Sequence, residues 1–171
     1  MEKRKIIEIF MGSDSDLEVI KDTAKQLESF GIEFGMYILS AHRCGDEVLE
    51  LARTAADSGV EIIIAGAGKA AHLPGVIAGA TCLPVIGIPM KTSDLGGLDS
   101  LYSIVQMPAG VPVATVAIGQ TGAKNAAILA AQMLGIKYPE IRKKVIDYEQ
   151  KMRNEVLAKN NKLQETGYDS Y

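Results

Sequence analysis

Histidine and arginine stand together in the segment 40–46, directly after an apolar run. His42 is the type of side chain that exchanges protons near neutral pH, and Arg43 is suited to hold a phosphate or a carboxylate through paired hydrogen bonds. The pair therefore indicates a site for an anionic ligand with acid–base chemistry. A surface histidine without a role is an equal alternative if this segment is taken by itself.

The segment 11–16, Met-Gly-Ser-Asp-Ser-Asp, offers a second set of polar groups after an apolar run. Gly12 permits a tight turn. The hydroxyl and backbone N–H groups of Ser13 and Ser15, placed at a helix start, favour an anion such as phosphate. Asp16 could accept hydrogen bonds from sugar hydroxyls. A simple helix N-cap explains the same residue types, and it is the better interpretation of this segment alone.

The segment 65–75, Ala-Gly-Ala-Gly-Lys-Ala-Ala-His-Leu-Pro-Gly, resembles a nucleotide-triphosphate loop at first sight. Such a loop requires the pattern G-x-x-x-x-G-K-[ST]. Ile63 stands where the first glycine belongs, and Ala70 stands where a hydroxyl would meet magnesium. ATP binding by that route is therefore excluded. A turn of small residues remains, which lets a ligand approach the backbone with Lys69 and His72 facing it.

Thiol and metal chemistry find little support in the sequence. Cys44 lies two residues from His42, but no third residue is evident that would orient the pair for nucleophilic catalysis. Cys44 and Cys82 form neither a CxxC pair nor a zinc-binding spacing, and nothing in the spacing of the two histidines selects a metal site. We therefore predict no metal site. Asp46 is interpreted as the N-cap of the helix that follows.

Apolar runs and helical periodicity alternate along the chain. Runs typical of strands cover residues 5–11, 34–39, 60–65, 84–89 and 112–118. Helical spacing covers residues 17–30, 46–58, 98–107 and 123–134. Continuous apolar strands that alternate with helices indicate a parallel sheet buried on both faces. We predict an α/β fold with a three-layer, doubly wound, parallel five-stranded sheet of flavodoxin-like order 2-1-3-4-5, which binds ligands beyond the carboxyl ends of its strands.

The C-terminal part of the chain predicts one further, long helix. Pro139 stands where such a helix would begin. An apolar stripe then follows at steps of three and four: Ile141, Val145, Tyr148, Met152 and Val156. The stripe must be buried either on a neighbouring subunit, which we favour, or on the chain's own sheet. We accordingly divide the chain into a catalytic domain, residues 1–136, and a C-terminal helical extension, residues 137–171.

Composition limits the classes of function that the chain can serve. It has 171 residues, of which 47% are hydrophobic and 23% charged, with a formal net charge of −3. This composition is typical of one soluble globular domain, and the weak acidity gives no basic surface for nucleic acid. No apolar run approaches the roughly 20 residues that a membrane span needs. Met1 leads directly into charged residues, so we expect no signal peptide and a cytoplasmic location.

Taken together, the loops resemble those of one enzyme family. Five motifs occur in the order and spacing of the N5-carboxyaminoimidazole ribonucleotide mutases: MGSDSD, SAHR, GAGKAAHLPG, GLDSLYSIVQMPAGVPVATVAIG and GAKNAAILAAQMLG. The resemblance covers residues 6–136. It implies an isomerase of purine biosynthesis that moves a carboxylate from the exocyclic N5 to carbon 4 of an aminoimidazole ribonucleotide. The substrate is decarboxylated and then recarboxylated, with neither ATP nor a metal and with no cofactor.

The resemblance also implies roles for particular residues. His42 would be the general acid and base that moves the proton. The ribose and phosphate would be held by Ser13, Asp16, Ser40 and Arg43. The loop over the base and the released carbon dioxide would include Gly68, Lys69, His72 and Leu73. Members of the family are octamers whose C-terminal helices pack on neighbouring subunits, so a homo-octamer is expected here.

Two positions depart from the usual family pattern. Cys44 and Gly45 replace a Thr-Pro pair, a change that would alter the stiffness of the loop more than its chemistry. Lys69 stands where the family usually has glycine, and it adds a cation beside the expected carboxylate site. The lysine either strengthens binding of that carboxylate or points to solvent. A related class carboxylates aminoimidazole ribonucleotide directly with carbon dioxide, but it lacks the AAHLPG motif, so mutase activity is the first expectation.

Overall fold

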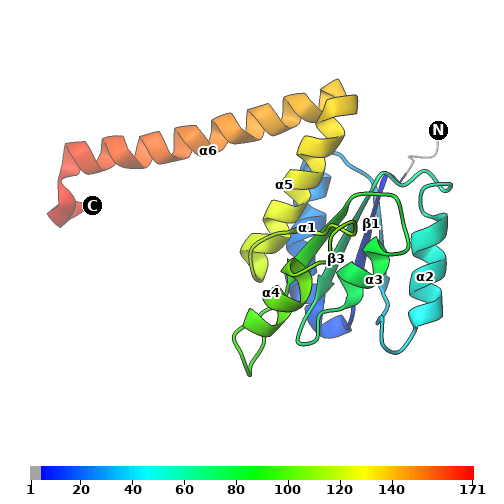
Figure 1. Ribbon diagram of the computed structural model, residues 1–171. Helices are drawn as coiled ribbons and strands as arrows, with labels where there is room; N and C mark the ends of the chain where they lie inside the picture. The colour runs from blue at the N-terminus through cyan, green and yellow to red at the C-terminus, as the bar shows by residue number, and fades with distance from the viewer. Residues whose placement is uncertain (1–4) are drawn as a thin grey trace.

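A five-stranded parallel sheet forms the centre of the structure, a computed structural model that describes residues 5–171 (Figure 1). Its strands are β1 (Ile7–Met11), β2 (Phe34–Ile38), β3 (Ile62–Ala67), β4 (Val85–Pro89) and β5 (Ala114–Thr115). They lie in the order β2-β1-β3-β4-β5, and every neighbouring pair is parallel. The predicted order 2-1-3-4-5 is therefore confirmed.

Strand β5 is much shorter than the predicted strand at residues 112–118. Only Ala114 and Thr115 pair regularly with β4. Pro112 has no N–H group to donate, and a strand at the edge of a sheet has a partner on one side only. The chain nevertheless stays beside β4, because the N–H of Val116 donates to Gly87 and the N–H of Gly119 donates to Pro89. This arrangement keeps the residues that follow β5 at the same edge of the sheet.

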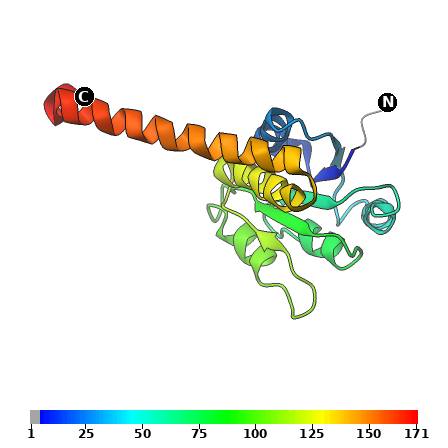
Figure 2. The same cartoon turned by 90° about the horizontal axis from the view of Figure 1, so that it is seen from above.

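Helices cover both faces of the sheet, as the three-layer prediction required (Figure 2). The helices are α1 (Leu17–Ser29), α2 (Gly45–Thr54), α3 (Leu73–Ala78), α4 (Leu98–Val105), α5 (Gln120–Lys137) and α6 (Pro139–Thr166), with two short 3-10 turns, Asp14–Asp16 and Tyr168–Ser170. Helices α1 and α5 pack on one face, and α2, α3 and α4 pack on the other. Within residues 5–171, no helix combines the length and apolar character needed to cross a membrane.

Small side chains let α1 and α5 approach closely. Most of the buried residues of α5 are alanines: Ala123, Ala126, Ala127, Ala130 and Ala131. The buried Thr23 hydroxyl on α1 donates a 2.8 Å hydrogen bond to the carbonyl oxygen of Ala123. Gly122 lies where the chain turns into α5, and a Cβ there would overlap the carbonyl oxygen of Ala117. Close backbone contact at this point therefore requires glycine.

Helix α2 starts one residue earlier than predicted and ends four residues earlier. Cys44 occupies the N-cap position, and no side chain bonds to the helix start there. The interpretation of Asp46 as the N-cap is therefore wrong. Asp46 lies inside the first turn, where its carboxylate still faces the positive end of the helix. Residues 55–58 form turns that lead to Gly59, which has a φ of +90°.

Helix α6 divides the predicted apolar stripe into two halves. Ile141 and Val145 are buried in the core that α5 shares. The Tyr148 ring meets the edge of Phe30 at 5.6 Å between ring centroids. Beyond that point α6 leaves the domain and extends alone (Figures 1 and 2), with Val156 64% exposed. The first half of the stripe thus folds onto its own domain, and the second half has no partner within the described chain.

Candidate active site

A cavity of about 390 Å³ lies at the carboxyl edge of the sheet. The loops that follow β1, β2, β3 and β4 surround it. All nine residues predicted for the site line this one cavity: Ser13, Asp16, Ser40, His42, Arg43, Gly68, Lys69, His72 and Leu73. Its volume is in the range of cavities that hold small metabolites. Loops from four different strands therefore converge as the predicted sheet order requires.

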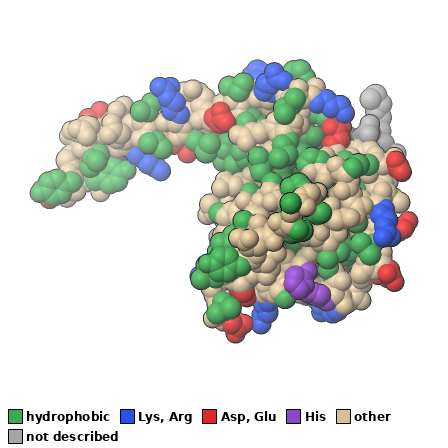
Figure 3. Space-filling model, viewed as in Figure 1, with side chains coloured by type: hydrophobic (Ala, Val, Ile, Leu, Met, Phe, Trp, Pro, Cys, Tyr) green, Lys and Arg blue, Asp and Glu red, His purple; other side chains and the backbone are tan. Residues whose placement is uncertain are grey.

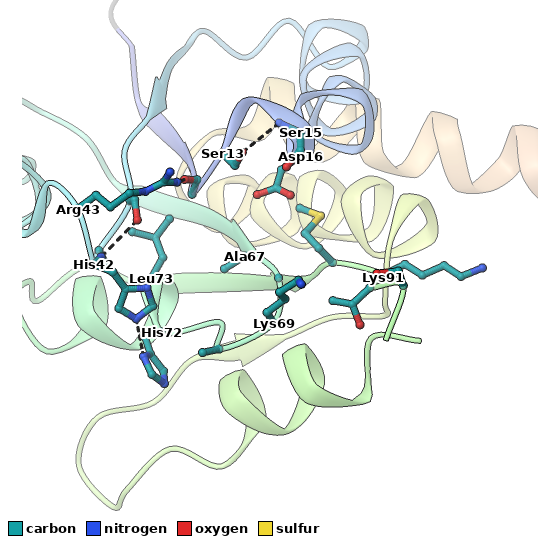
Figure 4. A pocket seen from close by; sticks show the side chains of 18 residues that line it. Ser13, Ser15, Asp16, His42, Arg43, Ala67, Lys69, His72, Leu73 and Lys91 are labelled. Carbon is teal, nitrogen blue, oxygen red and sulfur yellow. Dashed lines mark hydrogen bonds between the residues drawn. The ribbon is translucent and has the colours of Figure 1, made fainter. Parts of the chain in front are cut away.

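The loop after β1 presents hydroxyl groups and one carboxylate. The Ser13 hydroxyl accepts a 3.3 Å hydrogen bond from the N–H of Ser15, so it does cap the short 3-10 turn. Asp16 makes no capping bond to α1. Its carboxylate points into the cavity (Figure 4), and burial raises its pKa above the ordinary value of 3.8. The capping interpretation thus holds for Ser13, while the Asp16 carboxylate faces the cavity.

The loop after β2 is tied to the loop after β1. One terminal nitrogen of Arg43 donates a 3.1 Å hydrogen bond to the carbonyl oxygen of Gly12. The hydroxyl of the buried Ser40 accepts a 3.3 Å hydrogen bond from the N–H of His42. The backbone carbonyl of Ser40 accepts a 2.9 Å hydrogen bond from the N–H of Cys44. Arg43 is thereby held between the two loops, with its remaining N–H groups available to an anion.

The two histidines of the chain form a pair. Nε2 of His42 lies 2.8 Å from Nδ1 of His72, and the two rings meet edge to face with 4.9 Å between their centroids. His72 stands at the start of α3, so the loop after β3 carries it to the loop after β2. Figure 4 shows the contact, and Figure 3 shows histidine side chains together on the molecular surface. An exposed pair of imidazoles at a cavity is able to exchange protons with a ligand.

Lys69 adopts a backbone conformation that most side chains avoid. Its φ is +57°, and within residues 5–171 no other residue except glycine has a positive φ. The conformation costs a non-glycine residue about 1–2 kcal/mol. The Lys69 N–H donates a 3.0 Å hydrogen bond to the fully buried Ser100 hydroxyl, and its Nζ lies 3.0 Å from Oδ2 of Asp94. The side chain thus forms an ion pair at the rim of the cavity.

Glycine and small residues make room on the β3 side of the cavity. A Cβ at Gly66 would collide with the side chains of Met90 and Ile20. A Cβ at Gly68 would come within 3.3 Å of the Met90 Cβ. Leu73 is buried among the residues of α3 and lends the cavity an apolar wall. The small residues therefore leave room for the side chains of Met90 and Ile20.

The loop after β4 also lines the cavity, and it was not predicted from the sequence. Met90, Lys91, Thr92 and Ser93 line the cavity directly after β4. The signal was available, because these residues follow a predicted parallel strand and must reach the same edge of the sheet. Lysine, threonine and serine are also ordinary in solvated loops, so their types alone did not distinguish them. Thr92 donates a 2.9 Å hydrogen bond to Asp99 and accepts the N–H of Gly97, which stabilises this loop.

Comparison with known proteins identifies the family. The family described as AIR carboxylase matches residues 6–155. The chain belongs to this family. The match includes all four loops around the cavity and the first half of α6.

Other members of the AIR carboxylase family are similar over nearly their whole length. The N5-carboxyaminoimidazole ribonucleotide mutase of Thermotoga maritima is 61% identical over 163 residues, which cover 95% of this chain and 94% of that one. The protein of the same name from Pyrococcus horikoshii is 54% identical, covering 99% of this chain and 94% of the relative. The crystal structure of Treponema denticola PurE superposes with a TM-score of 0.84 at 29% identity, covering 92% of this chain and 97% of that chain.

Proposed function

We propose that this chain is an N5-carboxyaminoimidazole ribonucleotide mutase of purine biosynthesis. It would move the carboxylate from N5 of an aminoimidazole ribonucleotide to carbon 4 of the ring. The observation that carries the proposal is the 61% identity to the Thermotoga maritima mutase over 95% of this chain. The cavity supports it chemically, because hydroxyl groups, a guanidinium and a pair of imidazoles surround a space of about 390 Å³.

The first two loops would hold the ribose and phosphate of the substrate. Arg43 is oriented by its bond to Gly12, which leaves further N–H groups to pair with phosphate oxygens. Ser13 and Ser40 both line the cavity, and their hydroxyl groups would contribute to the phosphate site. Asp16 would accept hydrogen bonds from the ribose hydroxyls. These contacts would place the imidazole ring between the histidine pair and the loop after β3.

The reaction replaces the bond between N5 and the carboxyl carbon by a bond between carbon 4 and the carboxyl carbon, and it moves one proton. The bond between N5 and the carboxyl carbon breaks, and its electron pair stays on N5, which takes a proton as carbon dioxide is released. Carbon 4 then attacks the carbon dioxide, and the new carbon–carbon bond forms before carbon 4 loses its proton. His42 would give the first proton as a general acid and take back the second as a general base. Proton and charge therefore balance within the site.

The loop after β3 would hold the ring and the carbon dioxide. Gly68 and Leu73 offer a backbone surface and an apolar wall, which suit a small uncharged molecule better than charged side chains do. His72 would orient His42 through the 2.8 Å contact between their rings. Lys69 is engaged with Asp94 at the rim. It would therefore not be the residue that holds the transferred carboxylate.

A cytoplasmic homo-octamer completes the proposal. Support for assembly comes from the second half of α6, which carries exposed apolar side chains outside the domain: Met152, Val156, Leu157 and Leu163. A helix with such a stripe is stable when another chain covers it. Light scattering of the Val156→Glu variant tests this part: the charge should shift the mass toward smaller species. An unchanged octamer would contradict a role for α6, and a monomeric wild type would contradict assembly.

The decisive experiment offers two substrates to the purified protein. We expect N5-carboxyaminoimidazole ribonucleotide to be converted efficiently, and aminoimidazole ribonucleotide with low bicarbonate to be converted poorly. A preference for the second pair would identify a direct carboxylase instead. His42→Asn should lower turnover by about 10²–10⁴-fold while ligand binding stays within about threefold, because this is the usual contribution of general acid–base catalysis. Near-normal activity of this variant would overturn the assignment of His42.

A further inference from the structure

We propose that the Lys69–Asp94 ion pair closes one side of the cavity and retains the carbon dioxide between the two halves of the reaction. The inference rests on the proposed mutase function. It adds two residues that determine whether the carbon dioxide is attacked by carbon 4 or escapes to solvent. Lys69 belongs to the loop after β3, and Asp94 belongs to the loop after β4. Their contact therefore joins two separate walls of the same cavity.

The geometry places the pair beside the cavity lining. Lys69 lines the cavity, and so do Lys91, Thr92 and Ser93, which lead directly to Asp94. Nζ of Lys69 lies 3.0 Å from Oδ2 of Asp94. Figure 4 shows Lys69 between the histidine pair on one side and the loop that carries Lys91 on the other. The ion pair consequently spans the gap between these two loops at the rim.

Both ends of the bridge are anchored by the backbone. The N–H of Lys69 donates to the buried Ser100 hydroxyl of α4 at 3.0 Å. On the other loop, Thr92 bonds to Asp99 at 2.9 Å and accepts the N–H of Gly97 at 3.1 Å. These contacts fix where each charged side chain leaves its loop. The flexible part of the bridge is then the ion pair itself, which is exposed and free to open for substrate entry.

The chemistry gives this bridge a function. Carbon dioxide is small, uncharged and weakly bound, so its escape competes with attack by carbon 4. A ligand-bound cavity that stays closed favours attack, and one that opens releases carbon dioxide to solvent and admits dissolved carbon dioxide in its place. The pair also leaves the Lys69 ammonium neutralised by Asp94 at 3.0 Å, which argues against direct contact with the transferred carboxylate.

The test measures how much carbon dioxide exchanges with solution during turnover. Unlabelled N5-carboxyaminoimidazole ribonucleotide is converted in the presence of ¹³C-bicarbonate and carbonic anhydrase, and the label in the product is measured at early times. A parallel sample without the protein gives the label that enters the substrate spontaneously. The variants are Lys69→Asn, because asparagine tolerates the positive φ at position 69 while it removes the long cationic side chain, and Asp94→Asn, which removes the charge at nearly constant shape. The charge-exchanged double variant, Lys69→Asp with Asp94→Lys, is the matched control.

We expect either single variant to incorporate about two- to fivefold more label per turnover than wild type, as befits an exposed ion pair. The double variant should return toward the wild-type value. Raising the salt concentration should increase label uptake by wild type and leave the single variants unchanged, because salt screens only an existing pair. Equal label in wild type and both single variants would overturn the proposal, as would an effect of Lys69→Asn alone. Failure of wild type to convert the substrate would instead overturn the mutase function on which it rests.

Discussion

Nε2 of His42 and Nδ1 of His72 are 2.8 Å apart, so one of the two nitrogens donates a hydrogen and the other accepts it. The contact engages Nε2 of His42, and its direction sets which ring nitrogens of the two histidines carry a hydrogen. His42 comes from the loop after β2, and His72 comes from the start of α3. If His42 is the proton carrier proposed above, its proton transfer is coupled to a residue on a different element.

Replacement of His72 tests this coupling. His72→Asn should lower kcat about tenfold while KM stays within about twofold, because the general acid–base group loses its orienting partner and the ribose phosphate contacts remain. Steady-state kinetics with the mutase substrate give both values. In a His42→Asn background, the same change should have no further effect, because residues that act as a unit are not additive. An additive loss would show that His72 acts independently of His42.

Asp16 should make nucleotide binding sensitive to acid. Burial raises the pKa of its carboxyl above 3.8, and the ionised form is the one that accepts hydrogen bonds from ribose hydroxyls. Affinity for aminoimidazole ribonucleotide should therefore fall as the pH drops through this raised pKa. Isothermal titration measures it. Asp16→Asn should bind about five- to tenfold more weakly at neutral pH, as expected for one lost charged hydrogen bond, and should lack this part of the acid dependence.

Asp16→Asn also distinguishes the contribution of Asp16 to the pH dependence of binding from that of the ligand's phosphate group. The phosphate also gains a proton near pH 6, which weakens binding to both proteins alike. The difference between wild type and Asp16→Asn is thus the signal of interest. Parallel pH profiles for the two proteins would contradict a ribose contact for Asp16.

Glu8 should reduce the stability of the fold at neutral pH. It lies on the interior strand β1 and is 8% exposed, and its Oε2 atom has no hydrogen-bond partner among residues 5–171, although Tyr37 donates to Oε1 at 3.2 Å. Burial raises the pKa of Glu8 above 4.5. The neutral form is therefore favoured in the folded state, and stability is lost as the pH rises from about 4.5 through the higher folded pKa.

Glu8→Gln should accordingly raise the free energy of unfolding by about 1 kcal/mol at pH 7.5, because a neutral amide costs less to bury than a carboxylate. At about pH 4, where wild type is also neutral, the difference should vanish. Urea unfolding at the two pH values measures both quantities. Tyr37→Phe is the opposite control, since it removes the one donor and should destabilise the protein. A gain that is equal at both pH values would exclude ionisation of Glu8 as its cause.

Gly122 should not tolerate a methyl group. A Cβ at this position would overlap the carbonyl oxygen of Ala117, which is backbone and cannot rotate away. Gly122→Ala should therefore lower the free energy of unfolding by about 1–3 kcal/mol. Gly45→Ala is the matched control, because no described atom of residues 5–171 lies within 4 Å of its Cβ position and it stands at the start of α2. Thermal unfolding of the two variants compares them, and equal melting temperatures would contradict the predicted clash.

Much of the architecture could be predicted from the sequence, because β1, β3 and β4 are apolar apart from Glu8, as suits strands buried on both faces. Strand β5 was predicted too long, since pairing at a sheet edge depends on a partner that the local pattern does not reveal. The start of α5 was missed because Gln120–Gly122 is polar and contains glycine. Residue types favour strand, helix or loop only weakly at such positions, and tertiary contacts decide where an element begins and ends.

The candidate site shows a similar division. Histidine, arginine and clustered glycines stand out from an ordinary loop, and the loops that contain them were identified. The loop after β4 was missed because Lys91, Thr92 and Ser93 resemble any solvated segment. The partner of Lys69 was also unpredictable, since a contact with Asp94 depends on how two loops meet in space. The sequence pattern indicated three of the four loops that line the cavity, and the fold determined which atoms meet.

Helix α6 begins at the opposite edge of the sheet from the cavity, since α5 runs back from the carboxyl edge before Pro139 (Figure 1). Its exposed half then leads away from the domain. The free end of α6 therefore cannot reach the pocket of its own subunit. Within one chain, substitutions on the exposed half of α6 therefore leave the lining of the cavity untouched, so the two surfaces can be varied independently in experiment.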